Sequence, residues 1–196
     1  MQRAIDHSNL SLRDATVDDI EAVVALVESG YRGDLSRKGW TTEADMLDGQ
    51  RIDPAGVLEV IVKPESRVLL VECDGKLSAC CHLERQDESA YFGMFTVSPL
   101  QQGSGLGGYL LAAAERIARD EWNCVELRMT VISIRNELVT WYERRGYRRS
   151  GQFKPFPYGD ERFGIPKRDD LRFEFLTKSL AREDTAFAAD VGSPDR

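Results

Sequence analysis

The segment from Gln102 to Gly108 has the composition of a phosphate-binding turn. It reads Gln-Gly-Ser-Gly-Leu-Gly-Gly and lies between a stretch with the pattern of a strand and one with the pattern of a helix. Main-chain N–H groups at the start of a helix point outward together, and glycine lets a phosphate approach them closely. The segment therefore predicts a site for a pyrophosphate group, although a flexible turn would use the same residues.

Two other nucleotide-binding patterns compete for this turn. Gly103, Gly105 and Gly108 also satisfy the G-x-G-x-x-G pattern of dinucleotide-binding proteins. That pattern normally opens a unit of parallel strands and is followed by a carboxylate at the end of the next strand. Here hairpin signals precede the turn, Glu126 lies at the start of the next predicted strand, and no lysine supplies a P-loop. Both alternatives are disfavoured, and an oxidoreductase would be distinguished by stabilisation with NADH rather than CoA.

A second motif follows the turn along the chain. Asn136 opens a segment with the pattern of a short helix, Tyr142 lies within it, and Gly146-Tyr147 follows its end. Two linked motifs in this order are far more specific than a glycine-rich turn alone.

Together the two motifs resemble the GCN5-related N-acetyltransferase (GNAT) superfamily. The hallmark of that superfamily is [QR]-x-x-G-x-[GA] between its fourth strand and third helix, and it is matched by Gln102, Gly105 and Gly107. The resemblance follows the order of elements over about Leu12 to Lys178 and carries motif-level detail from Phe95 to Tyr147.

The resemblance implies how acetyl-CoA is held. In this family the strands on either side of the glycine-rich turn splay apart, and the pantetheine arm pairs with the exposed strand edge. Turn amides hold the pyrophosphate, and Asn136 hydrogen-bonds the arm, although a plain helix N-cap would also explain this asparagine. The implied acetyl-CoA site consists of Phe95, Thr96, Val97, Gln102, Gly103, Ser104, Gly105, Leu106, Gly107, Gly108 and Asn136.

Acetyl transfer to an amine needs an unprotonated nucleophile, a donor for the oxyanion and a proton for the departing thiolate. The resemblance assigns Tyr142 as the general acid toward sulfur, and a strand N–H near Phe95 to Val97 as the oxyanion donor. An unperturbed phenol, with a pKa of about 10, is protonated at neutral pH. Leu138, Trp141 and Tyr142 also have the spacing of a buried helix face, so Tyr142 could instead be core.

The general base is not identified by the sequence. Many relatives carry a glutamate on the strand before the turn, but Tyr91 to Val97 contains no carboxylate. Glu126, Glu84 and His82 are candidates, and a chain of water molecules is an equal alternative.

The resemblance implies that two segments recognise the acceptor: Tyr31 to Asp48 and Lys154 to Asp170. Their aromatic and acidic side chains suit an ammonium group, and a net charge of -7 also favours a cationic acceptor. The candidates are Trp40, Glu43, Tyr158 and Asp160.

Composition excludes several other functions. The four cysteines form no C-x-x-C pair and there are only two histidines, so no metal site is expected. The acidic net charge disfavours nucleic-acid binding, and no apolar run approaches the roughly 20 residues of a membrane span. Without a visible secretory signal, a cytoplasmic location is expected. A homodimer is compatible with the sequence.

The surrounding elements predict one domain over residues 1–196, with a core at about 11–178 and tails at 1–9 and 181–196. Asp74-Gly75 signals a tight hairpin, and an antiparallel meander precedes a strand-helix-strand crossover. The fold class is α+β, near the α/β border, with a mixed sheet and helices on both faces, and the GNAT resemblance implies that this sheet is mostly antiparallel and has seven strands. The expected activity is acetyl-CoA-dependent acetylation of a primary amine on a small molecule or protein. The alternative is a non-catalytic acetyl-CoA-binding sensor or interaction module.

Overall fold

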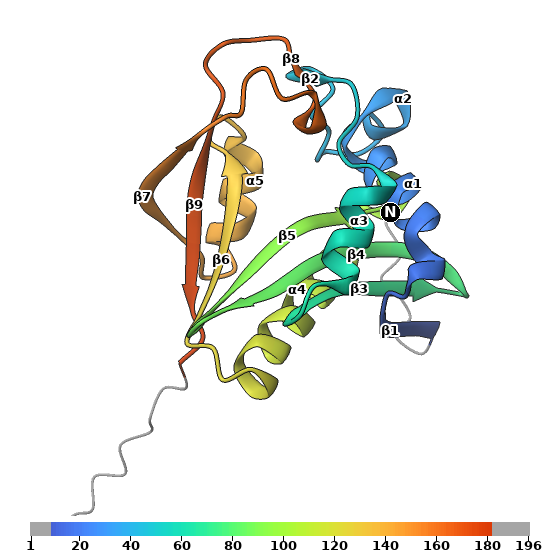
Figure 1. Cartoon of the computed structure of the whole chain (residues 1–196), viewed down its shortest axis with the longest axis vertical. Helices are drawn as coiled ribbons and strands as arrows, with labels where there is room; N and C mark the ends of the chain where they lie inside the picture. Colours follow the sequence, from blue (N-terminus) through green and yellow to red (C-terminus); the bar gives the residue numbers. More distant parts are fainter. Residues whose placement is uncertain (1–8, 182–196) are drawn as a thin grey trace, which may run out of the picture.

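The computed structural model describes residues 9–181 (Figure 1), so nearly all of both expected tails lies outside the described residues. The helices are α1 (Ile20–Tyr31), α2 (Gly33–Ser36), α3 (Pro54–Val62), α4 (Leu106–Arg116) and α5 (Asn136–Glu143). The strands are β1 (Leu10–Asp14), β2 (Leu47–Asp48), β3 (Ser66–Cys73), β4 (Lys76–Gln86), β5 (Ser89–Val97), β6 (Glu126–Ile132), β7 (Arg148–Pro155), β8 (Ile165–Pro166) and β9 (Arg172–Ser179).

Seven of these strands form one sheet in the order β1-β3-β4-β5-β6-β9-β7. Every neighbouring pair is antiparallel except β5 and β6, which are parallel. The predicted fold class, α+β with a mostly antiparallel seven-stranded sheet, is confirmed.

Helices cover both faces of the sheet (Figure 1). Successive side chains of a strand point to opposite faces: Val68 and Leu70 of β3 pack with α1 and α3, whereas Leu69 and Val71 pack with α4. The uninterrupted apolar run in β3 is therefore explained by burial on both faces.

Short local signals position the elements as the sequence predicts. Asp53 caps α3 by accepting a hydrogen bond from the Gly56 N–H at 2.7 Å, and Pro54 occupies the first turn. Asp74 and Gly75 both have positive φ, as a tight hairpin between β3 and β4 requires. The Thr16–Asp19 capping box is present, but it opens a short 3₁₀ turn that leads into α1.

The central strands splay apart. Only Ser89, Ala90 and Tyr91 of β5 pair with β6, and beyond Tyr91 the two strands diverge (Figure 1). A β-bulge lies in the diverging part, where Met94 has a φ of 49° and the register of β4 with β5 shifts. A bulge bends a strand and increases its twist, so the free edge of β5 turns toward the opening.

Two features differ from the sequence-based expectations. The two expected acceptor segments pair with each other through β2 and β8, strands of two residues each that are too short for a periodic pattern. The alternation of apolar residues at 125, 127 and 129 predicts that Val125 faces the core with Leu127 and Met129, but Val125 precedes β6 and is half exposed. No helix in residues 9–181 is long and apolar enough to cross a membrane.

Candidate functional site

A cavity of roughly 700 Å³ opens where β5 leaves β6, between the glycine-rich turn and α5. This is within the range of about 300–1,000 Å³ usual for small-molecule sites. Both motifs found in the sequence border it. The residues predicted for acetyl-CoA that line this cavity are Phe95, Val97, Gln102, Gly103, Gly105, Gly107, Gly108 and Asn136.

The glycine-rich turn presents open main chain at the start of α4. Gly103 and Gly105 have positive φ values of 81° and 104°, which L-amino acids with side chains rarely adopt. A Cβ built on Gly105 would meet no atom within 4 Å, whereas one on Gly107 would lie 3.3 Å from the Phe95 ring. The turn therefore keeps open space beside the first N–H groups of α4, which fits a pyrophosphate.

Three predicted acetyl-CoA residues do not line the cavity. Leu106 is buried in the core, Thr96 is buried with its methyl group against Gly30 of α1, and the Ser104 hydroxyl donates to the Gln101 carbonyl. Only their main-chain groups could contact a ligand.

Asn136 borders the cavity but is not the N-cap suggested as its further role. Arg135 is the N-cap residue of α5, and Asn136 is the first helical residue, with an exposed side chain. The main-chain N–H of Asn136 donates to the Ile134 carbonyl, and α5 begins at Asn136, one residue earlier than the capping pattern implies.

Tyr142 lies where this cavity meets a second one. The second cavity, of roughly 210 Å³, lies between the diverging parts of β5 and β6, and both cavities are bordered by Tyr31, Phe95, Arg135, Leu138 and Tyr142. The Tyr142 side chain is buried, yet its hydroxyl forms no hydrogen bond with any described residue. Tyr147, by contrast, donates to the Glu115 carboxylate at 2.9 Å.

Burial raises the pKa of Tyr142 well above that of a free phenol. Phe95 and Trp141 pack around its ring, with centroids 6.4 Å and 5.0 Å away. The side chain thus combines the two interpretations offered by the sequence, because its ring is part of the core and its hydroxyl remains available for chemistry.

The three candidate bases lie away from both cavities. Glu126 is paired with Arg128 at the closed end of the splay, and Glu84 accepts a hydrogen bond from Lys63 at 2.8 Å. His82 is hydrogen-bonded to Ser66, and burial lowers its pKa. Among the alternatives, the water chain agrees best with this arrangement.

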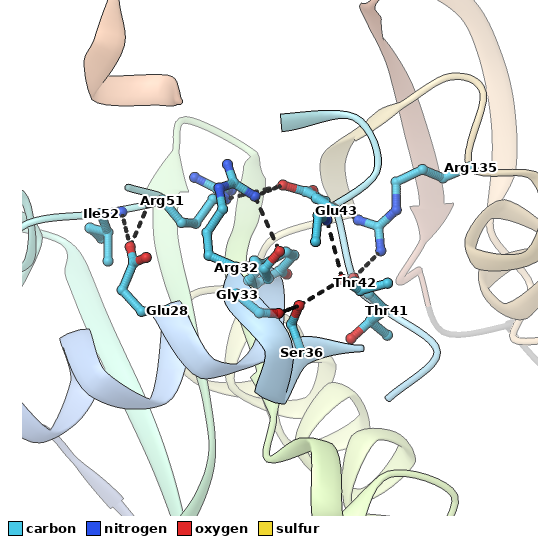
Figure 2. Close-up of polar contacts among 12 residues, drawn as sticks. Glu28, Arg32, Gly33, Ser36, Thr41, Thr42, Glu43, Arg51, Ile52 and Arg135 are labelled. Carbon is cyan, nitrogen blue, oxygen red and sulfur yellow. Dashed lines mark hydrogen bonds and ion pairs between the residues drawn. The ribbon is translucent and has the colours of Figure 1, made fainter. Parts of the chain in front are cut away.

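Four charged residues form a cluster beside the second cavity, which we call the Glu43 cluster: Glu43, Arg32, Arg51 and Arg135 (Figure 2). Glu43 accepts hydrogen bonds from Arg32 at 2.7 Å and Arg135 at 2.9 Å. The Nε atom of Arg51 lies 4.0 Å from the same carboxylate. Burial would raise the pKa of Glu43, but the charges of the three arginines outweigh it and lower the pKa.

The sequence predicts a role for Glu43 but none for the three arginines. Glu43 is predicted to attract an ammonium group, and the structure places it in the wall of the second cavity with its carboxylate already paired with Arg32 and Arg135. The arginines come from the end of α1, the loop before α3 and the start of α5. No local spacing relates them, so only the fold could reveal the cluster.

The other three acceptor candidates, Trp40, Tyr158 and Asp160, do not all lie at the same cavity. Trp40 borders the first cavity and lies 6.3 Å from Trp141, ring centroid to ring centroid. Tyr158 and Asp160 border neither cavity: Tyr158 accepts a hydrogen bond from the Leu171 N–H, and Asp160 is paired with Arg162. The structure therefore does not bring these last two residues together with Trp40 and Glu43.

Arg144 and Arg145 at the end of α5 also border the first cavity. The Arg145 guanidinium stacks on Trp141, with its carbon 3.5 Å from the ring centroid, and lies near Gly108. The sequence assigns these arginines no role, because they lie far from the glycine-rich turn along the chain and only the fold brings them beside the same cavity.

Comparison with known proteins agrees with this geometry. Residues 64–149 match the family described as the acetyltransferase (GNAT) domain. The match runs from just before β3 to the start of β7 and so includes the splay, the glycine-rich turn and Tyr142. None of the curated proteins matches the sequence.

Solved structures of N-acetyltransferases share the fold at low sequence identity. The ribosomal-protein-S18-alanine N-acetyltransferase from Escherichia coli superimposes with a TM-score of 0.66 and 13% identity, covering 91% of this chain and 99% of that one. Ard1 from Thermoplasma volcanium gives 0.66 and 18%, covering 89% and 99%. A mutant of spermidine N-acetyltransferase SpeG from Vibrio cholerae gives 0.63 and 16%, covering 89% and 95%.

Proposed function

We propose that this chain, whose residues 64–149 match the GNAT acetyltransferase domain, transfers an acetyl group from acetyl-CoA directly to a primary amine. The observation that carries the proposal is that Tyr142 lines both cavities, while its hydroxyl has no hydrogen-bond partner among the described residues. One cavity would hold the donor and the other the acceptor.

The first cavity has the parts that acetyl-CoA requires. Main-chain N–H groups of the glycine-rich turn would hold the pyrophosphate, and the cations Arg144 and Arg145 border the same space. The Phe95 and Val97 carbonyls already accept hydrogen bonds from Tyr31 and Gln102. Pairing of the pantetheine arm with β5 would therefore rely on N–H donors of the bulged segment.

The reaction needs one bond to form and one to break. The amine nitrogen attacks the acetyl carbon while a main-chain N–H near the bulge stabilises the oxyanion. Collapse of the tetrahedral intermediate breaks the carbon–sulfur bond, and Tyr142 gives its proton to the departing thiolate. The proton lost by the amine passes to water, since the candidate carboxylates and His82 lie elsewhere.

The alternative is a module that binds acetyl-CoA without catalysis. The structural neighbours do not indicate one class of acceptor, because the name of one specifies an alanine of a ribosomal protein and the name of another specifies spermidine. The presence of a buried tyrosine, Tyr142, that lines both cavities favours catalysis over sensing.

The test is an acetyl-CoA assay over a library of primary amines, with products identified by mass spectrometry and binding measured by calorimetry. We expect acetyl-CoA to bind and at least one amine to gain an acetyl group. Binding without any acetylated product would favour the sensor, and preferential stabilisation by NADH would overturn the assignment of the turn.

A further inference from the structure

We propose that the second cavity binds an acid group of the acceptor, so that the substrates are small primary amines bearing a carboxylate or a similar oxyanion, as α-amino acids do. This inference rests on the proposed acetyltransferase function and adds the class of acceptor. It adds an acid group to the cationic amine predicted from the acidic and aromatic loop residues and from the net charge of the chain.

The charge at the cavity is opposite to the charge of the protein. Three guanidinium cations surround the single carboxylate of Glu43, which its lowered pKa keeps ionised at neutral pH. The next carboxylate, Glu28, faces the main-chain N–H groups of Arg51 and Ile52 (Figure 2). Lys154 adds a further cation to the lining of the cavity.

The net charge around the second cavity is therefore positive even when the carboxylates of Glu43 and Glu28 are both counted. The whole chain, by contrast, has a net charge of -7. A concave site with low-dielectric walls focuses such local charge on its ligand. An acceptor with only positive charge would be repelled, whereas an oxyanion would be attracted.

Arg51 has donors that the protein does not use. Its side chain is 31% exposed and forms no hydrogen bond with any described residue, since the 4.0 Å separation from Glu43 is too long for one. Its guanidinium carbon lies 5.2 Å from the centroid of the Tyr31 ring, which restricts the direction of the group. A planar guanidinium with free N–H groups suits a carboxylate or phosphinate, which can accept two parallel hydrogen bonds.

Arg135 connects this subsite to the reaction centre. It borders both cavities, and it donates one hydrogen bond to the Glu43 carboxylate at 2.9 Å and another to the Thr41 carbonyl. Of its five N–H groups, others remain for a ligand. Because Tyr142 also borders both cavities, an amine close to its own acid group could reach the acetyl carbon while the acid lies between Arg51 and Arg135.

The buried side of the cluster explains how the arginines are held. Arg32 pairs with Glu43 in the protein interior, and the Nε and Nη2 atoms of Arg32 are buried without hydrogen-bond partners among the described residues. Arg32 does not line the second cavity, so its charge serves to occupy Glu43. The carboxylate is then shared among three cations, and it cannot fully neutralise the two that face the cavity.

The size of the cavity favours a small molecule over a protein acceptor. Its volume of roughly 210 Å³ is below the range of about 300–1,000 Å³ for typical ligand sites. A protein N-terminus would bring an amide instead of an acid next to its amine and would leave the cations without a partner.

The experiment compares three acceptors of matched shape: leucine, leucinamide and isoamylamine, which bear an acid, a neutral amide and no group beside the amine. Initial rates are measured with saturating acetyl-CoA, and products are identified by mass. We expect kcat/KM for leucine to exceed that for leucinamide by roughly 10- to 100-fold, the usual effect of hydrogen bonds to a charged group. Equal rates, or preference for either neutral-tailed amine, would overturn the inference and leave the proposed acetyltransferase intact.

Variants of Arg51 locate the effect. Arg51→Gln should raise the KM for leucine by roughly 10-fold or more with kcat little changed, and should lower the kcat/KM for leucinamide much less, because a neutral amide loses only a weaker hydrogen bond. Arg51→Lys should recover part of the loss, because it keeps the charge without the planar fork. The matched control is Arg116→Gln, an exposed arginine of α4 that borders neither cavity. An equal loss on leucine and leucinamide in Arg51→Gln would reveal a merely structural role.

A binding measurement keeps the test independent of turnover. N-acetylleucine and N-acetylleucinamide are titrated by calorimetry into the CoA-loaded protein, and only the acid should bind in the tested range. If CoA itself fails to bind, the proposed function falls. If CoA binds and the acid shows no advantage over the amide, only the present inference falls.

Discussion

The side-chain amide of Gln102 ties the glycine-rich turn to the acceptor loop by accepting a hydrogen bond from the main-chain N–H of Trp40 at 2.8 Å. Its Nε2 donates to the Thr41 hydroxyl at 2.7 Å and to the Val97 carbonyl at 3.2 Å. Gly39 makes room for this contact, since a Cβ there would lie 2.6 Å from Gln102 Oε1. The first residue of the motif thus holds the segment that carries Glu43.

Replacing Gln102 should therefore affect both sides of the site. We expect Gln102→Ala to lower the free energy of unfolding by about 1–2 kcal/mol, since several partly buried hydrogen bonds are lost, and to raise the KM for acetyl-CoA and for the acceptor together. Urea unfolding and steady-state kinetics measure these effects. Gln152→Ala, on the exposed strand β7, is the control. A change in only one of the two KM values would argue against the coupling.

The cofactor assignment is tested most cleanly at Gly108. The φ of 104° at Gly105 would strain any side chain, so a substitution there would mix folding with binding. Gly108 is helical, borders the cavity, and a Cβ there would meet only Arg145 at 3.8 Å. We expect Gly108→Val to weaken CoA affinity by at least about 10-fold, as lost phosphate hydrogen bonds would.

The matched control lies on the same helix. Ala112→Val adds a β-branched side chain at an exposed position of α4 and should leave CoA affinity unchanged. Calorimetry on both folded variants gives the comparison. Unaltered affinity in Gly108→Val would remove the glycine-rich turn from the cofactor site.

Much of the fold could be predicted because its signals are local. Asp74-Gly75 specifies a hairpin through the positive φ of both residues, and Asp53-Pro54 specifies a helix start. The linked motifs also identified the cavity that Phe95, the glycine-rich turn and Asn136 line.

The acceptor side could not be predicted in the same way. Glu43 and Arg135 are 92 residues apart, and the β2–β8 ladder that links the two acceptor segments has only two residues per strand. Neither a periodic pattern nor a turn signal records such contacts. The net charge of the chain also does not predict the charge of the acceptor site, because arginines from distant parts of the sequence lie together at the second cavity and make the local charge positive.

Glu43 should be needed for folding as well as for the shape of the cavity. Glu43→Gln leaves Arg32 and Arg135 without their anionic partner, and breaking a buried pair in this way costs about 3–5 kcal/mol. Asp45→Asn, which breaks an exposed pair with Arg37, should change stability little. Chemical denaturation distinguishes them, and equal stabilities would show that the Glu43 cluster is not a structural unit.

The pH dependence of activity should show one limb in the accessible range. The acceptor amine must lose its proton, so kcat/KM rises with pH through the pKa of that amine. Burial raises the pKa of Tyr142 well above that of a free phenol, so the acid stays protonated beyond pH 10. We therefore expect kcat/KM to rise with pH between about pH 6 and about pH 10, with no falling limb. A falling limb in this range that disappears in Tyr142→Phe would contradict the raised pKa.

Tyr142→Phe provides the decisive test of catalysis. The ring stays in its place among Phe95, Trp141 and Tyr147, so packing and stability should be retained, while only the hydroxyl that borders the two cavities is lost. We expect kcat to fall by roughly 10²–10⁴-fold, the range for a general acid, with CoA affinity nearly unchanged. Because product release could mask the chemical step, single-turnover rates should be compared.

Tyr147→Phe is the matched control for this substitution, because it removes the hydroxyl of a neighbouring buried tyrosine that donates to Glu115 and borders neither cavity. Its loss should reduce stability, since a buried hydrogen bond disappears, and should leave the single-turnover rate close to that of the unmodified enzyme. The two variants therefore predict opposite results: loss of rate without loss of stability at Tyr142, and loss of stability without loss of rate at Tyr147. A Tyr142→Phe enzyme with an unaltered single-turnover rate would remove this hydroxyl from the mechanism and favour the acetyl-CoA-binding sensor.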